Sequence, residues 1–119
     1  MDVLERYFDA IRRHDWQQLA ECLAEDVERT GPYLDVVRGR QAYVAFLSGL
    51  VPALRGYRLD VSGVRRLADG SALVQLRERV EVDGVAIEFP EAILFDFDAG
   101  GRIGRVAVYL QDPRGPRSR

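Results

Sequence analysis

Residues 74–93 read VQLRERVEVDGVAIEFPEAI, and their pattern is typical of a β-hairpin. The pair Asp83-Gly84 suits the two positive-φ positions of a type I′ turn, and apolar residues alternate on both sides of it. A turn at this pair places Glu78 opposite Phe89, and side chains that alternate with period two share one face. That face carries eight apolar side chains and two carboxyl groups, from Val74, Leu76, Glu78, Val80, Val82, Val85, Ile87, Phe89, Glu91 and Ile93.

The two carboxyl groups on this face are predicted to be diagonal neighbours. Glu91 lies opposite Leu76, so the Cβ atoms of Glu78 and Glu91 are expected about 7–8 Å apart. A carboxyl group on an apolar face loses hydration, and a second carboxyl nearby raises its pKa further. Such a pair supplies one acid and one base near neutral pH. Alternatively, an arginine such as Arg29 or Arg58 neutralises Glu78, or the pair lies at a solvated opening.

Length and composition indicate one domain. A chain of 119 residues with 47% apolar and 30% charged residues can form a core without a disulfide or a structural metal. We expect a single domain over residues 1–112. The basic tail 113–119 has no apolar residue and is predicted to be disordered.

Charge and hydropathy limit the classes of partner. A net charge of −2 argues against nucleic acid, which needs a concentrated basic face. No apolar run reaches the ~20 residues that a membrane span requires. The acidic N-terminus lacks a signal-peptide pattern, and a lone Cys22 suits a reducing compartment, so we expect a cytoplasmic protein.

Apolar periodicity predicts helices first and strands later. Asp2 is a candidate N-cap for a helix that buries a stripe of apolar residues, and Asp15 is a candidate N-cap for a second helix. Short extended pieces follow at 26–30 and 33–37, and a third helix at 41–51. Strands are then predicted at 57–66, 72–82, 85–97 and 102–111. This order favours an α+β domain, with helices on one face of a curved antiparallel sheet.

The last hairpin is predicted to turn at residues 98–101. A four-residue turn there places Ile93 opposite Val106, and in the same register Glu91 faces Val108 and Phe89 faces Leu110. The outer face of these strands is less polar than expected. Its apolar cluster predicts a homodimer through this face; the cluster is formed by Ala92, Leu94, Ala107 and Tyr109.

Several short motifs resemble those of the nuclear transport factor 2-like, or SnoaL-like, superfamily. They lie at Arg6–Ile11, Asp15-Trp16, Leu23–Val27, Val37–Arg40 and along the last strand. The resemblance implies a cone-shaped sheet wrapped around three N-terminal helices, a cystatin-like α+β roll with a pocket that is usually free of metal, and frequent dimers. Members include ketosteroid isomerases, polyketide cyclases, epoxide hydrolases, dehydratases and non-catalytic binding domains, so the fold does not determine the chemistry.

The ketosteroid isomerases of this superfamily provide a comparison for individual residues. The resemblance places their oxyanion tyrosine at Tyr7. Their general base falls near residues 29–31, where this sequence has no acid. Their second oxyanion group falls on Ile93, or beside Glu91 when Pro90 is used as the anchor. With one match in three, this specific activity is not expected.

The sequence therefore predicts a small-molecule pocket without a metal or a cofactor. One His and one Cys leave too few soft ligands for a transition-metal site, and no carboxylate spacing indicates one. Glu91 is the candidate general acid or base, assisted by Glu78 and Tyr7. The expected reaction is of isomerase, cyclase or lyase type on a small, largely apolar molecule; the alternative is a non-catalytic binding or dimerising accessory domain. The candidate ligand-binding residues are Trp16, Arg29, Tyr33, Asp35, Phe46, Tyr57, Leu76, Phe89, Ile93 and Val108.

Overall fold

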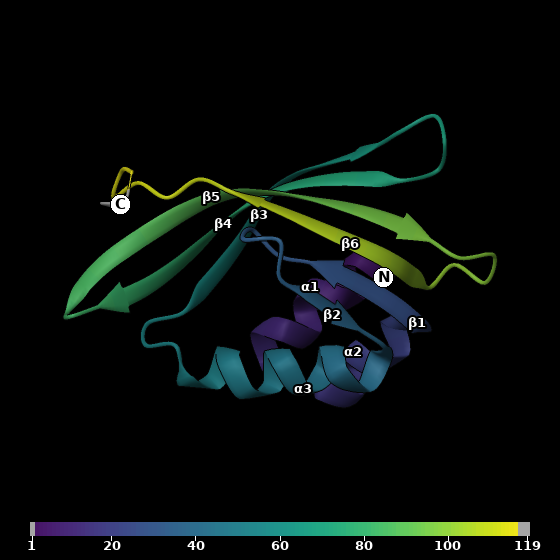
Figure 1. The fold of residues 1–119 in the computed structure, drawn as a ribbon, viewed down its shortest axis with the longest axis horizontal. Helices are drawn as coiled ribbons and strands as arrows, with labels where there is room; N and C mark the ends of the chain where they lie inside the picture. The colour runs from purple at the N-terminus through teal and green to yellow at the C-terminus, as the bar shows by residue number, and fades with distance from the viewer. Residues whose placement is uncertain (1, 117–119) are drawn as a thin grey trace.

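The structure, a computed structural model, describes residues 2–116 and packs three helices against one face of a curved six-stranded sheet (Figure 1). The sheet order is β2-β1-β6-β5-β4-β3. The predicted α+β fold is confirmed. The elements in chain order are α1 (Val3–Arg13), α2 (Trp16–Cys22), β1 (Leu23–Thr30), β2 (Val36–Arg38), α3 (Arg40–Leu50), a short 3₁₀ helix η1 (Val51–Ala53), β3 (Arg58–Arg66), β4 (Ala72–Val82), β5 (Val85–Phe97) and β6 (Ile103–Leu110).

The sheet is mixed, whereas the sequence analysis predicted an antiparallel one. β1 lies parallel to β6, with Arg29 opposite Val106, while the other four pairings are antiparallel. This parallel pairing joins the first strand to the last, with α3 and four strands between them in the chain. Periodicity reports which face a residue occupies and not which distant strand lies beside it, so this pairing was not predictable.

The central hairpin β4–β5 has the predicted register. Asp83 and Gly84 adopt φ values of 52° and 77° at its turn, as a type I′ turn requires. Glu78 faces Phe89, and Leu76 faces Glu91. Both carboxyl groups therefore lie on the same face of the sheet.

The predicted register of the last hairpin is wrong by two residues. Ile93 faces Val108 and not Val106, because the turn is one residue longer than predicted, with Phe97 facing Ile103, and β6 contains a bulge. The Asp98 carboxylate accepts hydrogen bonds from the backbone N–H groups of Gly100 and Arg102, each at 2.9 Å. A two-residue shift leaves each side chain on its predicted face, so the inward apolar row is preserved while its partners change.

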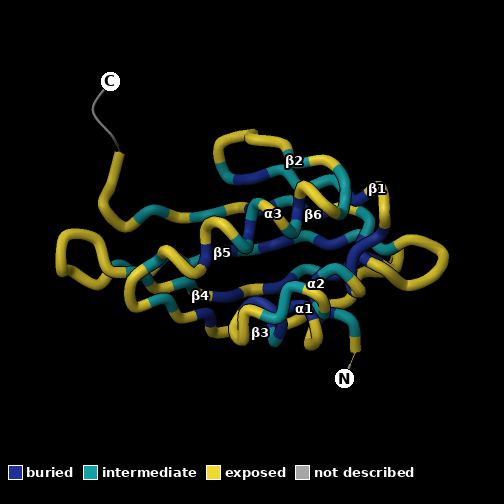
Figure 2. Tube along the Cα trace, turned by 90° about the horizontal axis from the view of Figure 1, so that it is seen from below, coloured by how far each residue is buried: buried dark blue, intermediate teal, exposed yellow. Residues whose placement is uncertain are grey.

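The core lies between α1 and the middle of the sheet. The apolar stripe of α1 is buried as predicted, and it consists of Leu4, Tyr7, Phe8 and Ile11. The Phe95 ring packs edge-on against the rings of Tyr7 and Phe8, with centroids 5.4 and 5.9 Å away. Buried residues follow the middle of the strands and exposed ones the turns (Figure 2). At the tip of β4–β5, Val85 is 62% exposed because the hairpin extends beyond the helices (Figure 1).

The C-terminal segment contacts the sheet over part of its length. Arg114 donates a hydrogen bond to the Asp112 carboxylate at 2.8 Å, and its guanidinium lies 5.6 Å from the centroid of the Phe89 ring. Residues 117–119, part of the tail predicted to be disordered, lie outside the described residues.

A glycine substitution tests the central turn. Gly84→Ala is expected to lower the free energy of unfolding by about 1 kcal/mol, because an added Cβ disfavours the positive φ. Gly49→Ala is the matched control: it lies in α3 with open space around it and no positive φ, so stability should stay equal or rise slightly. Urea denaturation measures both, and equal losses in the two variants would contradict the assigned turn.

Candidate active site

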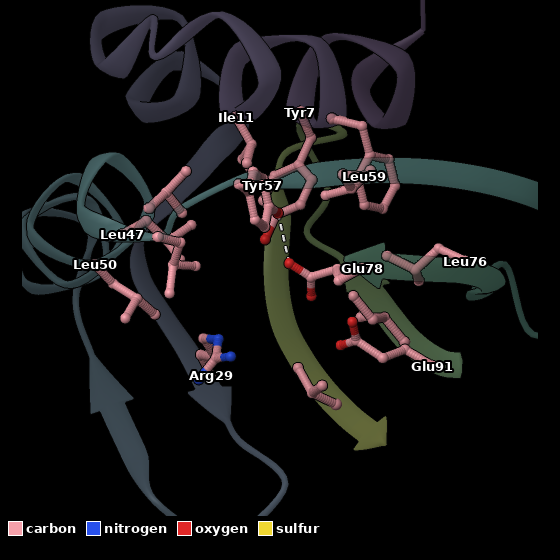
Figure 3. Close-up of a pocket in the computed structure, with 15 residues that line it drawn as sticks. Tyr7, Ile11, Arg29, Leu47, Leu50, Tyr57, Leu59, Leu76, Glu78 and Glu91 are labelled. Carbon is pink, nitrogen blue, oxygen red and sulfur yellow. Dashed lines mark hydrogen bonds between the residues drawn. The ribbon is translucent and has the colours of Figure 1, made fainter. Parts of the chain in front are cut away.

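A cavity of about 80 Å³ lies between the helices and the inner face of the sheet (Figure 3). Most of its wall is aliphatic or aromatic, from α1, the end of α3, η1 and the inward positions of the strands. Five of its side chains carry hydroxyl, guanidinium or carboxyl groups, and these are Tyr7, Arg29, Tyr57, Glu78 and Glu91. Volumes of 300–1,000 Å³ are typical of pockets for drug-sized ligands, so this cavity suits a molecule of only a few heavy atoms.

Glu91 is the buried acid of the cavity. It is 7% exposed and lies in the middle of β5. Burial is the largest cause that raises its pKa well above the usual range, and the neighbouring Glu78 carboxyl raises it further, while the charge of Arg29 lowers it in part. Glu91 therefore keeps its proton at neutral pH and can donate it.

Glu78 is held by a tyrosine and not by an arginine. The Tyr57 hydroxyl donates to Glu78 Oε2 at 2.5 Å. The two arginines predicted as possible partners of Glu78 bind elsewhere: Arg58 pairs with Asp60 at 3.9 Å, and Arg29 pairs with a loop aspartate. Burial and the Glu78 carboxylate raise the pKa of Tyr57, so its hydroxyl stays a donor.

Tyr7 reaches the cavity from α1, but its hydroxyl has a protein partner. Its oxygen lies 2.6 Å from the hydroxyl oxygen of Tyr43 on α3, and either group could be the donor. Burial is the main cause that raises the pKa of Tyr43 to about 12, and it raises the pKa of Tyr7 as well. Both hydroxyls are therefore neutral at physiological pH.

Arg29 brings a positive charge to the opposite wall. Its side chain is 13% exposed, and its guanidinium carbon lies 4.8 Å from the centroid of the Phe46 ring. It points into the cavity from β1, across from Glu91 (Figure 3).

The structure brings together all three predicted catalytic residues and half of the predicted ligand-binding residues. Among the latter, those that line the cavity are Arg29, Tyr57, Leu76, Ile93 and Val108. Those that lie outside its wall are Trp16, Tyr33, Asp35, Phe46 and Phe89.

The residues outside the wall have other contacts. Trp16 stacks on His14 with ring centroids 5.6 Å apart, and Tyr33 is 74% exposed in the turn before β2. Asp35, in the same loop as Tyr33, pairs with Arg29. The ring of Phe46 lies beneath the Arg29 guanidinium, and the ring of Phe89 lies beneath that of Arg114.

The sequence analysis missed most of the aliphatic wall. The helix stripes were assigned to the core because helical periodicity identifies an inward face but does not distinguish packed core from cavity. The missed residues are Phe8, Ile11, Leu47, Leu50, Val51, Leu54 and Leu59.

Residues 2–116 contain neither a cluster of metal ligands nor a membrane-spanning helix. No group of three or more His, Cys, Asp and Glu side chains is placed to hold a metal ion in this part of the chain. None of its helices is both long enough and apolar enough to cross a bilayer.

Comparison with known proteins identifies the family. The family model described as the SnoaL-like domain matches residues 4–106. The chain belongs to the SnoaL-like family. The resemblance seen in the sequence to the nuclear transport factor 2-like superfamily is thereby confirmed, and this SnoaL-like chain has relatives of known structure.

The similar proteins differ in their described chemistry. Rv0034, an uncharacterised protein of Mycobacterium tuberculosis, is 32% identical over 123 residues, covering 99% of this chain and 93% of that protein. The structure of a ketosteroid isomerase candidate from Kribbella flavida has a TM-score of 0.77 at 24% identity, covering 98% of this SnoaL-like chain and 81% of that chain. An LEH-like epoxide hydrolase of M. tuberculosis has a TM-score of 0.76 at 18% identity, covering 92% and 80%. The two structures share the fold.

The buried tyrosine pair makes a testable contribution to stability. Tyr7→Phe and Tyr43→Phe should each lower the free energy of unfolding by about 1–3 kcal/mol, because each leaves a buried hydroxyl without its partner. The double variant should lose less than the sum of the two, since it removes both hydroxyls. Chemical denaturation of all four proteins measures the coupling, and strict additivity would show that the hydroxyls do not interact.

Proposed function

We propose that this protein is an acid/base enzyme of isomerase, cyclase or lyase type that needs no cofactor and acts on a small, largely apolar molecule. One observation carries the proposal: a mostly apolar cavity holds two neighbouring carboxyl groups, one of which keeps its proton. Two carboxyl groups whose environments separate their pKa values are able to divide acid and base roles between them.

In this proposal each carboxyl group has its own role. Glu78 is the base: it removes a proton from a carbon next to a carbonyl group. Glu91 is the acid: its O–H donates a hydrogen bond to the carbonyl oxygen and stabilises the enolate that forms. With a β,γ-unsaturated ketone, Glu78 then returns the proton to the γ-carbon of the dienolate, so the C=C bond moves into conjugation with the carbonyl group and no atom is gained or lost.

Two tyrosines support this chemistry. Tyr57 fixes the position of Glu78 through its 2.5 Å hydrogen bond, so it is a positioning residue. Tyr7 lines the cavity and assists as a neutral hydroxyl beside the developing negative charge. Two structures of the same fold are described as a ketosteroid isomerase candidate and an epoxide hydrolase, which supports an enzyme that acts on a small molecule and does not indicate a substrate.

A second candidate function is ligand binding without turnover. The observation that favours it is the cavity volume of about 80 Å³, together with the pairing of the Tyr7 hydroxyl with Tyr43. In this case the carboxyl groups orient a ligand, or the domain serves as a dimerising accessory with a residual cavity.

A homodimer through the outer sheet face is part of the proposal. The apolar cluster predicted from the sequence is continuous across β5 and β6, because Ala92 faces Tyr109 and Leu94 faces Ala107. Tyr109 is 61% exposed, and a second copy of the chain would bury it. We place this dimer in the cytoplasm, where the single buried Cys22 stays reduced, with a small molecule and not a nucleic acid or membrane as its partner.

Deuterium exchange tests the proposed enzyme. Cyclopentanone is a small enolisable ketone, and NMR in D₂O should show faster loss of its α-protons with the protein than in matched buffer. The rate should survive dialysis against a chelator. Binding of the ketone without exchange would favour the second candidate, and neither binding nor exchange by a panel of small ketones would favour the accessory role.

A further inference from the structure

Two buried polar atoms on opposite walls of the cavity have no hydrogen-bond partner. Among residues 2–116, the buried side-chain nitrogen and oxygen atoms in this state are Arg29 Nη1 and Glu91 Oε2. Buried polar groups are nearly always paired, because an unpaired one forfeits its hydration without compensation. Both atoms belong to residues that line the same cavity, so a molecule in the cavity is the natural partner of both.

The charge of Arg29 is only weakly compensated by the protein. Its counter-ion is Asp35, whose Oδ2 lies 3.7 Å from Nη1, which is too long for a hydrogen bond. The Asp35 side chain is 48% exposed, and its Oδ1 accepts a hydrogen bond from the backbone of Tyr33. The guanidinium also lies over the Phe46 ring and interacts with the Tyr43 hydroxyl. A guanidinium in this state attracts an anion more strongly than it attracts a neutral carbonyl group.

The far wall of the cavity does not oppose an anion at Arg29. Glu91 keeps its proton, and the carboxylate of Glu78 beside it accepts the hydrogen bond of the Tyr57 hydroxyl (Figure 3). A negatively charged group is therefore directed toward Arg29 and away from Glu78, which gives the ligand one orientation.

We propose that Arg29 binds the carboxylate of a small monocarboxylic acid, whose carbon chain crosses the aliphatic part of the cavity toward Glu91 and Glu78. The planar guanidinium matches a carboxylate in shape and charge. The cavity volume of about 80 Å³ limits the ligand to a short chain. The inference deepens the proposed function, on which it rests for the reaction at the far end of the ligand; the binding itself is separately testable.

A matched pair of probes tests the site. Butyrate and butyramide have the same shape and differ in charge, and protein NMR titrations at neutral pH in a buffer without carboxylates measure their affinities. Butyrate should bind the native protein at least about 10-fold more tightly than butyramide. Arg29→Gln should weaken butyrate by about 10- to 100-fold, as expected for charge-assisted hydrogen bonds, and leave butyramide unchanged.

Two further variants provide a second test of the site and a control. Asp35→Asn removes the competing carboxylate and should tighten butyrate by a few fold. Arg79→Gln is the matched control, because Arg79 is an exposed residue of β4 on the opposite face of the sheet, and it should change nothing. Equal affinities of the native protein for butyrate and butyramide, or unchanged butyrate binding in Arg29→Gln, would overturn the inference. If Arg29→Gln does not fold, the inference is tested by the preference of the native protein for butyrate and by the butyrate affinity of Asp35→Asn.

The outcome is distinguishable from failure of the proposed function. Selective butyrate binding without deuterium exchange of any carbonyl substrate would support the carboxylate site and contradict the proposed enzymatic function. Deuterium exchange of cyclopentanone without a preference for butyrate over butyramide would support the proposed enzymatic function and contradict the carboxylate site.

Discussion

Glu91→Gln is expected to reduce the rate of α-proton exchange by about 10²–10⁴-fold, the usual contribution of a positioned acid or base. Glutamine keeps the size of the side chain, but its amide N–H is far less acidic than the carboxyl O–H and stabilises the enolate less. Glu78→Gln should cause a loss of similar size, because the two groups act as one unit and their effects do not add. The double variant is therefore expected to be little slower than either single variant.

The control for this prediction lies on the same strand. Glu88 belongs to β5 but is exposed on the outer face, where it pairs with Arg77 at 3.8 Å. Glu88→Gln should retain full activity, since an exposed ion pair contributes little. NMR measures the exchange rate of cyclopentanone with each variant. An unchanged rate in Glu91→Gln would show that Glu91 has no part in the mechanism.

The stability of the protein is expected to fall as pH rises above the ordinary glutamate pKa. Glu91 keeps its proton in the folded state, because burial and Glu78 raise its pKa, but it releases that proton on unfolding once the pH exceeds about 4.3. The folded state then binds more protons than the unfolded state, so higher pH favours unfolding. The loss reaches at most about 1.4 kcal/mol per pH unit, and it ends where the pH passes the raised pKa of Glu91.

Glu91→Gln removes this dependence. Urea denaturation at about pH 6 and about pH 8 should show a loss of up to about 2.7 kcal/mol in the native protein, whereas the variant should lose much less and should exceed the native protein in stability at the higher pH. Glu88→Gln should behave like the native protein. Parallel pH profiles of the native protein and Glu91→Gln would show that Glu91 is ionised in the folded state.

The sequence alone determined the elements of this protein and the placement of its two acids. Turn chemistry is local, so Asp83-Gly84 specified the register of β4–β5, and the period of two then placed Glu78 and Glu91 together on the inner face. The apolar stripe of α1 and the family motifs are likewise properties of short segments. The turn sequence did not predict the register of the last hairpin, because the hydrogen bonds of Asp98 and a bulge in β6 shift the pairing of β5 and β6 by two residues.

Only the tertiary structure decided which side chains surround the two acids. Tyr57, the residue before β3, reaches Glu78. Arg29 reaches the opposite wall from β1, which pairs with β6, a strand far away in the sequence. Periodicity tells which face a residue occupies, but it does not tell which distant side chain lies opposite or where packing leaves a gap. The partners of the two acids, the surroundings of the Arg29 guanidinium and the small cavity depend on those distant contacts, which form only when the sheet packs around the helices.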